Sequence, residues 1–444
     1  MLNYLWLALV LGAVALGGWN GQLPTVTERA LNMARFAVMD LALPLAGVMA
    51  LWLGMMRLAE RSGLVRVLAR ALRPVLTRLF PDVPPEHPAM GAMVMNIAAN
   101  MLGLANAATP LGLRAMRDLE SLNPRPGTAT NAMCTFLAIN TGSVQLIPVT
   151  AIAVLVANHA REPAAIIGPA FAATACAAVC AVTGVKLLQR LPWFQLPPLP
   201  AGPAAAGPAA APAAEPTPEA PAPGPLSRWG GVALGLFALG FLALFLRTAF
   251  PALFGREQPA DWAADGPGVR VVKTLSLLAL PALLGFFPLF AAARGLRVYE
   301  EFTEGAKEGF QVSLRIIPNL VAMLVAIGMF RGAGGVELLT ALLQPVLSLV
   351  HFPPELLPIA LIRPLSGSGA LGVFTELVKQ YGPDSLLTRT AGTLYGSTET
   401  TFYVLAVYFG AANIRRTRHA VLAGLIADTA GVIASVIICR LVFG

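Results

Sequence analysis

Long apolar stretches separated by short polar connections run along the whole chain. Most of them are long enough to cross the hydrocarbon core of a bilayer, which is about 30 Å thick and needs about 20 apolar residues. The apolar stretches are Leu2–Gly18, Ala37–Met56, Ala164–Val185, Gly230–Leu246, Thr274–Ala293, Pro318–Phe330 and Ala420–Leu441. This pattern predicts an all-α polytopic membrane protein.

The composition strengthens this prediction and excludes an ordinary soluble enzyme. Only 12% of the residues are charged and the mean hydropathy is +0.69, whereas soluble domains carry about 25% charged residues. The net charge of +8 comes from arginines between the apolar stretches, where the positive-inside rule places them. We therefore expect the lipid bilayer, and no nucleic acid, as a partner. Cys176 and Cys180 alone make an incomplete metal site, so no metal or cofactor is expected.

A segment rich in proline and alanine divides the chain. Residues 198–225 are almost entirely Pro, Ala and Gly with two glutamates. Such a composition forms no packed core and favours an extended spacer. We therefore predict one module at 1–192, a cytoplasmic linker at 193–228 and a second module at 229–444.

The two modules carry matching motifs in the same order, which indicates an internal duplication. The matched segments are 54–57 with 328–331, 73–76 with 344–347, 84–86 with 353–355, 106–112 with 366–372 and 140–143 with 397–400. An odd number of predicted crossings separates Arg57 from Arg331, so the second copy should be upside down.

Charge supports this inverted arrangement. The arm at residues 57–78 holds six arginines, whereas its counterpart at 331–352 is nearly neutral. A basic arm inside the cell and a neutral arm outside are typical of inverted-topology repeats. We predict nine spans, with the N-terminus in the cytoplasm, and arms that lie as helices on the membrane surface.

Each module also contains a segment that is too polar for a lipid-facing helix. Met93–Leu119 has asparagines and helix-breaking residues at its centre, and Ile359–Gln380 has the run Arg363–Gly369. Backbone that leaves a helix at membrane depth is tolerated only where it is buried in protein or lines a cavity. Each segment is therefore predicted to form a re-entrant helical hairpin.

A second polar segment follows each hairpin. Thr130–Val149 contains Asn140–Ser143, and Thr393–Tyr408 contains Gly396–Thr401. We predict discontinuous transmembrane helices whose polar runs unwind. For any single serine or threonine, a hydrogen bond within its own helix is the simpler role, so the prediction depends on the repeated set.

Three ionisable residues stand inside predicted membrane segments: Arg363, Glu399 and Asp428. A charge is costly at the bilayer centre, so such residues usually face a cavity and pair. We expect Arg363 to pair with Glu399 or Asp428. The pair would serve as a structural salt bridge or as part of a ligand-binding or proton-coupling site.

The polar motifs resemble two known proteins. Asn96–Met116 and Phe136–Thr150 resemble spore maturation protein A, whereas Arg363–Phe374, Tyr381–Ser385 and Gly396–Gly410 resemble spore maturation protein B. The chain thus resembles a fusion of the two, both of which belong to the nucleoside-recognition "gate" group. The resemblance implies two hairpin-and-broken-helix gates that face each other, as in concentrative nucleoside transporters.

From these patterns we expect an integral protein of the bacterial inner (cytoplasmic) membrane that resembles a secondary transporter. It would move a small polar solute through a midplane site between the hairpins; coupling to Na+ or H+ and homo-oligomerisation are left open. The alternative is a non-transporting scaffold or an assembly factor for the envelope or spore maturation. A polar cavity between the hairpins would favour transport, and a space filled by side chains would favour a scaffold. No enzyme activity is expected, because no Ser-His-Asp, HExxH, Walker or GxGxxG pattern stands in a suitable context.

The predicted substrate-binding residues come from the hairpin tips and the unwound segments, where backbone groups and half-helix ends are exposed. In the first module they are Asn100, Asn106, Thr109, Asn140, Thr141, Ser143 and Gln145. In the second module they are Arg363, Ser366, Ser368, Ser397, Thr398, Glu399 and Thr400. We expect each hairpin tip to approach the unwound segment of its own module, and the two clusters to face each other near mid-membrane.

Overall fold

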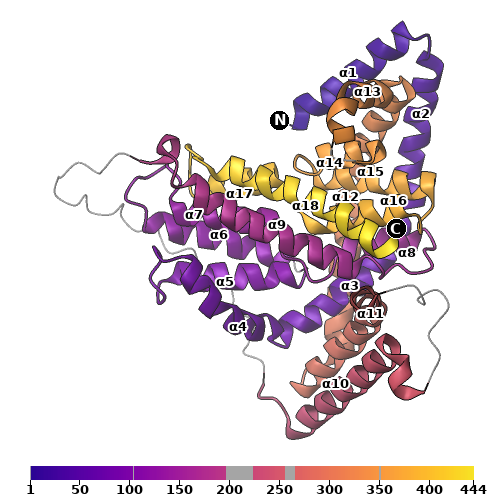
Figure 1. The fold of residues 1–444 in the computed structure, drawn as a ribbon. Coiled ribbons are helices and arrows are strands. Elements are labelled where there is room, and N and C mark those ends of the chain that lie inside the picture. The colour runs from indigo at the N-terminus through magenta and orange to yellow at the C-terminus, as the bar shows by residue number, and fades with distance from the viewer. Residues whose placement is uncertain (1, 104, 197–223, 256–265, 350–351) are drawn as a thin grey trace, which may run out of the picture.

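The computed structural model describes residues 2–103, 105–196, 224–255, 266–349 and 352–444. Within these ranges the chain folds into helices that pack against one another (Figure 1), and the one strand-like contact there is an isolated bridge between Thr128 and Arg416. Residues 197–223, which make up most of the predicted linker, lie outside the described ranges. The all-α prediction is confirmed for the described part of the chain.

The helices divide between the two halves of the chain. The first half contains α1 (Leu2–Trp19), α2 (Leu23–Phe36), the π-helical η1 (Ala37–Ala42), α3 (Leu43–Arg61), α4 (Leu64–Leu79), α5 (Pro88–Met101), α6 (Ala105–Ser121), α7 (Asn131–Gly142), α8 (Val149–Ala157), α9 (Ile167–Leu188) and η2 (Pro192–Phe194). The second half contains α10 (Arg228–Ala249), η3 (Pro251–Phe254), α11 (Pro267–Ala293), α12 (Val298–Gly332), α13 (Gly335–Leu349), η5 (Pro354–Leu356), α14 (Leu357–Ile362), α15 (Gly367–Tyr381), α16 (Leu386–Ser397), α17 (Thr401–Ala411) and α18 (Ala420–Phe443).

Several helices have the length and apolar surface of membrane spans. In the described ranges, five helical runs qualify: Leu23–Arg61, Ile167–Leu188, Arg228–Ala249, Pro267–Ala293 and Ala420–Phe443. The predicted span at 37–56 is therefore part of a run that also includes α2. On α10, Leu236 and Leu239 are 66% and 63% exposed, a surface that suits contact with lipid. The protein is a multi-pass membrane protein, and the count of nine spans stays a prediction.

The 35-residue helix α12 joins the two halves by packing along α3. A Cβ atom at Gly305 or at Gly309 would lie 2.5 Å from a backbone carbonyl oxygen of α3. Small residues let membrane helices approach closely, and this packing replaces the hydrophobic driving force that is missing in lipid. Arg57 on α3 adds ion pairs to Glu301 and Glu308 on α12, at 2.9 and 2.7 Å.

Each half contains a helical hairpin whose break lies inside the predicted segment. A short turn separates α5 from α6, and Gly103 in this turn has a φ of +76°, a conformation that favours glycine. Residues 363–366 separate α14 from α15. Ser366 caps α15, because its hydroxyl accepts a hydrogen bond from the backbone N–H of Gly369 at 3.0 Å.

The two discontinuous helices are also interrupted inside the predicted segments. Residues 143–148 separate α7 from α8, and residues 398–400 separate α16 from α17. The first arm of each begins at a side-chain cap: the Thr130 hydroxyl accepts from the backbone N–H of Met133 at the start of α7, and the Ser385 hydroxyl accepts from that of Thr388 at the start of α16. Helices α7 and α16 therefore both begin at a side-chain cap and end at a polar segment.

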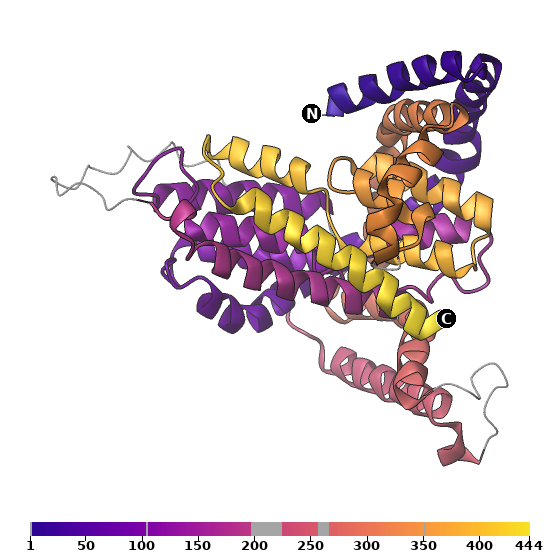
Figure 2. The ribbon, with the colours of Figure 1, turned by 45° about the horizontal axis from the view of Figure 1, so that its top comes forward.

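The last helices of the two halves, α9 and α18, lie side by side and run antiparallel (Figures 1 and 2). A Cβ atom at Gly184, near the end of α9, would lie 3.3 Å from Ile426, near the start of α18. Farther along, a Cβ atom at Gly431 would lie 3.4 Å from Ala177. Because both helices are candidate spans, their facing middle parts define the depth at which the broken helices are held.

The close approach of α3 and α12 is testable by adding one methyl group. Gly309→Ala should destabilise the protein by about 1–3 kcal/mol through overpacking, measured as a lower midpoint of thermal unfolding in detergent. Gly47→Ala on α3 is the matched control, because a Cβ atom there meets nothing within 4 Å. Equal midpoints for the two variants would contradict the packing described.

Candidate functional site

The two broken helices cross at their unwound segments. Glu399, between α16 and α17, donates its backbone N–H to the carbonyl oxygen of Thr141 at the end of α7, at 3.0 Å. No water is available to satisfy unpaired backbone in a hydrocarbon core, so each break helps to satisfy the other. We call this region, residues 141–146 and 397–402, the crossing.

Each hairpin is tied to the crossing by a backbone hydrogen bond of the same kind. In the first half, Leu146 donates its N–H to the carbonyl oxygen of Met101 at 3.0 Å. In the second half, Phe402 donates to the carbonyl oxygen of Pro364, also at 3.0 Å. The turn of each hairpin and the break of the following helix therefore form one unit.

Arg363 brings a buried positive charge to the crossing. Its guanidinium lies 3.8 Å from the Glu399 carboxylate, donates to the Thr400 hydroxyl at 3.3 Å and donates to the carbonyl oxygen of Thr398. The ring of Tyr395 covers one face of the guanidinium, 4.5 Å from its central carbon. The expected pair of Arg363 with Glu399 is formed, and it fixes the hairpin turn against the second broken helix.

Glu399 is the exposed partner of this pair. The Glu399 side chain is 36% exposed, whereas that of Arg363 is 5% exposed. The other Glu399 oxygen accepts a hydrogen bond from the side-chain amide of Gln145 at 2.8 Å. A carboxylate, an amide and a guanidinium thus meet at one place, where they can exchange hydrogen bonds with a polar solute.

A second polar cluster links α5 and α7 with α17. Asn100 donates to the side-chain oxygen of Asn140 at 2.8 Å, and the Tyr408 hydroxyl lies 3.5 Å from the same oxygen. Asn96 donates to the Tyr408 hydroxyl at 3.1 Å. Gly112 makes room for this ring, because a Cβ atom there would lie 2.3 Å from it. A tyrosine of the second half therefore completes a site built from the first.

Comparison with known proteins accounts for both halves of this arrangement. The nucleoside-recognition (Gate) family model matches residues 42–158 and 313–415. Spore maturation protein B of Bacillus subtilis (strain 168) is 46% identical over 176 residues, which is 40% of this chain and 99% of that protein. Spore maturation protein A of the same organism is 41% identical over 182 residues, which is 41% of this chain and 92% of that protein.

The chain belongs to the spore maturation protein A and B family. Each relative matches nearly over its whole length and covers about two fifths of the chain, which is consistent with a fusion of two family members. No solved structure is a significant match to the chain. The two Gate matches contain both hairpins and both broken helices, so the crossing is formed by the matched regions.

The structure brings some of the predicted site residues of this family member into contact. Asn100 meets Asn140; Gln145, Glu399 and Arg363 form a chain; and Thr398 and Thr400 bind Arg363. The hydroxyls of Ser366 and Ser368 instead lie 3.4 Å from each other. Gly367 stands between these serines, and a Cβ atom on it would lie 3.0 Å from the Thr400 hydroxyl.

Other predicted residues have local roles. The hydroxyls of Thr141 and Ser397 donate to carbonyls of their own helices, as Ser and Thr often do in membrane helices. The Ser143 hydroxyl is buried without a partner among the described residues. Thr109 is partly buried on α6, and the side chain of Asn106 lies outside the described part of the structure. As substrate-binding residues, all of them remain predictions.

Asn96 and Tyr408 were not among the predicted site residues. Asn96 stands one helical turn before Asn100, so it lies on the same face of α5. A buried tyrosine usually needs a partner for its hydroxyl, and Tyr408 follows a run of apolar residues in α17. Both signals are present in the sequence, but the pairing of α17 with the first half is a tertiary contact that no local pattern reveals.

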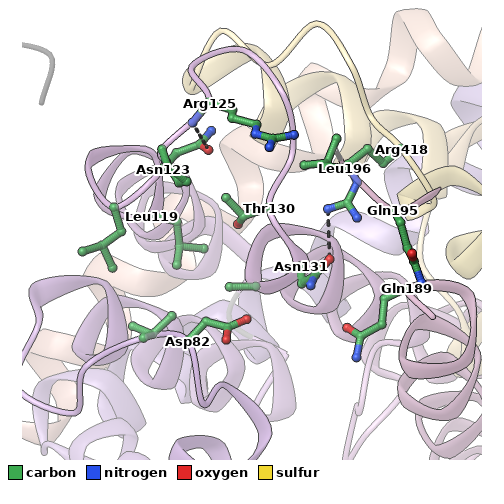
Figure 3. A pocket seen from close by; sticks show the side chains of 14 residues that line it. Asp82, Leu119, Asn123, Arg125, Thr130, Asn131, Gln189, Gln195, Leu196 and Arg418 are labelled. Carbon is green, nitrogen blue, oxygen red and sulfur yellow. Dashed lines mark hydrogen bonds between the residues drawn. The ribbon is translucent and has the colours of Figure 1, made fainter. Parts of the chain in front are cut away.

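Two cavities lie at opposite ends of the α9–α18 pair. The first, about 580 Å³, is lined by Gln189 directly after α9 and Arg418 just before α18, together with Arg125, Thr130 and Asn131 (Figure 3). The second, about 620 Å³, is lined by residues 161–165 before α9 and by Asp384, Arg389 and Phe443. Residues of the crossing line neither of these two cavities.

The first cavity has a fixed basic wall. The Arg418 guanidinium donates to the side chain of Asn131 at 2.9 Å (Figure 3). It also donates to the carbonyl oxygens of Ala129 and Phe194. Next to it, burial and the charge of Arg418 lower the pKa of His419 to about 4. His419 is therefore neutral at physiological pH, and arginine carries the positive charge of this wall.

The role of Tyr408 can be tested by removing one oxygen. Tyr408→Phe leaves the buried amide of Asn96 without this acceptor, which should cost about 1–3 kcal/mol and lower the midpoint of thermal unfolding in detergent. Tyr403→Phe is the control, since Tyr403 lies on the same helix and is 57% exposed. An unchanged midpoint for Tyr408→Phe would show that the cluster does not hold α17.

Proposed function

We propose that the protein is a secondary transporter of the bacterial inner membrane that binds a small polar solute at the crossing. The observation that carries this proposal is the meeting of Arg363, Glu399 and Gln145 with two unwound backbone segments. Ionisable residues inside a membrane generally mark a solute or ion pathway. The exposed fraction of Glu399 gives a solute a carboxylate to bind.

The arrangement of elements supports two inverted repeats, at 1–192 and 229–444. The same backbone bond joins hairpin and break in both halves, and α9 and α18 are antiparallel. Inverted repeats place a site near the midplane and let one half rock against the other. In this proposal the two cavities at the ends of the α9–α18 pair are the aqueous approaches from the two sides.

Charge supports an orientation. Arg125, Arg190, Arg415, Arg416 and Arg418 all lie at the end of the α9–α18 pair that holds the first cavity. Arginine-rich connections are retained in the cytoplasm. We infer that the first cavity faces the cytoplasm and the second faces outward, as the arginines of residues 57–78 also predict.

A scaffold is the second candidate, and one observation favours it. The polar side chains of the crossing satisfy one another, because Gln145 and Arg363 both bind Glu399, and the cavities end before they reach these residues. In the transporter proposal this is a closed state, in which a solute would replace the Gln145 or Arg363 contact. In the scaffold the contacts would be permanent.

The inverted arrangement predicts that the two cavities are reached from opposite sides of the membrane. In a background without the native cysteines, Leu122→Cys in the first cavity wall should react with an impermeant maleimide only in inside-out vesicles. Arg161→Cys in the second should react in intact cells. Labelling of both positions from one side would refute inversion.

Transport should be lost when the Glu399 charge is removed. Metabolite profiles of cells with and without the protein identify the solute, and uptake of that solute into proteoliposomes then measures activity; nucleosides are tested first because the family description names them. Glu399→Gln should lower uptake about tenfold or more, the loss expected for a hydrogen bond to a charged group.

Glu376→Gln is the matched control, because Glu376 on α15 is also paired with an arginine, Arg331, away from the crossing. It should keep uptake if it folds. If the wild-type protein takes up no solute and the Glu399→Gln variant still returns a deletion strain to the wild-type phenotype, the scaffold is the correct function.

A further inference from the structure

Asp428 on α18 is a buried acid with one unsatisfied oxygen. The residue is 4% exposed. One carboxylate oxygen accepts a hydrogen bond from the Thr401 hydroxyl at 2.6 Å, and the other, Oδ1, has no hydrogen-bond partner among the described residues. A buried polar atom without a partner costs about 1–3 kcal/mol, and more when it is charged, so this oxygen needs an explanation.

Two glycines on the same face of α18 bring Asp428 against the crossing. A Cβ atom at Gly424 would lie 2.7 Å from the Thr401 side chain, and one at Gly431 would lie 2.5 Å from the Thr398 side chain. Asp428 stands between them along the helix, so it faces the gap between α16 and α17.

The end of α16 supplies further acceptors one turn along α18 from Asp428, where a Cβ atom at Gly431 would lie 3.5 Å from the Ser397 hydroxyl oxygen. The backbone N–H of Glu399, which would continue the helix by bonding to Tyr395, donates to Thr141 instead. The last carbonyls of a helix lack partners within it and carry the negative end of its dipole. Ser397, the last residue of α16, adds a hydroxyl that lies 3.1 Å from that of Ser435 on α18.

In the first half, a hydroxyl on α9 satisfies the end of the broken helix without an ion. Thr174 on α9 donates its hydroxyl to the carbonyl oxygens of Gly142 and Ser143, at the end of α7. One turn farther along α9, the backbone of Ala178 lies 3.2 Å from where a Cβ atom on Gly142 would stand. In the second half, Gly431 on α18 lies similarly close to the Thr398 side chain. Thr174 on α9 thus meets the end of α7, whereas α18 presents Asp428 beside the start of α17. A hydroxyl can donate to carbonyls, whereas an ionised carboxylate cannot.

We propose that Asp428 and the end of α16 bind a sodium ion, which is the coupling ion of the proposed transporter. With Asp428 ionised, as binding of a cation would require, the crossing would carry one positive charge, on Arg363, and two negative charges, on Glu399 and Asp428, which one monovalent cation would balance. A divalent cation is less suited, because Ca²⁺ and Mg²⁺ sites usually have more carboxylate or water ligands. Broken helices bind Na+ through such half-helix ends. The proposed ligands are Asp428 Oδ1, the Ser397 hydroxyl and the last carbonyls of α16.

The ion-coupling role depends on the proposed function, but binding can be measured without transport. The purified full-length protein in detergent is unfolded by heat in NaCl, KCl or choline chloride at equal ionic strength. NaCl should raise the unfolding midpoint above that in KCl. Asn is a neutral isostere of Asp, so the Asp428→Asn variant should bind sodium more weakly. The NaCl concentration that gives half of the rise in the unfolding midpoint should increase about tenfold or more, as when a residue of a metal site is lost. Glu376→Gln should leave that concentration unchanged.

The outcomes separate the site from the transporter. Equal midpoints in NaCl, KCl and choline chloride for the wild type would overturn the sodium site, whether or not solute is transported. A stabilisation that follows pH equally in NaCl and KCl, and that Asp428→Asn removes, would identify a proton and also overturn it. Sodium binding without any solute uptake would leave the site standing and refute transport. If Asp428→Asn does not fold, Ser397→Ala should weaken the sodium effect about threefold or more.

Discussion

The structure depends on the requirement that every backbone group at membrane depth has a partner. Four interrupted helical segments stand in the centre of this protein, and each interruption would leave carbonyl and amide groups in lipid. The backbone bonds from Glu399 to Thr141, from Leu146 to Met101 and from Phe402 to Pro364 remove part of this cost. Each interruption is satisfied by another interruption. The hairpins and broken helices therefore stabilise one another, which is consistent with their occurrence as a set in both halves.

The same constraint joins the halves more closely than a linker would. The second arm of each broken helix packs into the other half: α17 contacts α6 and α7, and α8 contacts α15 and α16. Tyr408 on α17 takes hydrogen bonds inside the first half. Opening the crossing by separating the halves would thus break helix packing and backbone bonds at once. A smaller motion, in which a solute displaces Gln145 or Arg363 from Glu399, leaves this framework intact.

Most of the fold could be predicted from local patterns, because hydrophobic length and polar interruptions are properties of consecutive residues. The apolar runs gave spans such as α9 and α18, and the polar runs gave the breaks after Gly142 and Ser397. Contacts across the halves were harder. Arg363 had two candidate acids and paired with Glu399, while Asn100 on α5 reached Asn140 on α7. Such choices depend on how helices are placed in three dimensions, as the approach of α18 through Gly424 and Gly431 shows.

The charges at the crossing are poorly explained by stability alone. A buried ion pair is often matched or exceeded in stability by apolar residues of similar volume, because desolvation offsets attraction. Arg363 is nearly fully buried, and Asp428 has an oxygen with no hydrogen-bond partner in the described structure. In the first half, α9 meets the end of α7 through the Thr174 hydroxyl, which needs no charge. A contact that serves packing alone can thus be made by a hydroxyl in this fold. The acid is instead the arrangement expected where a cation binds and leaves, since only a charged, incompletely satisfied group gains enough from the ion to couple its binding to a change in the crossing.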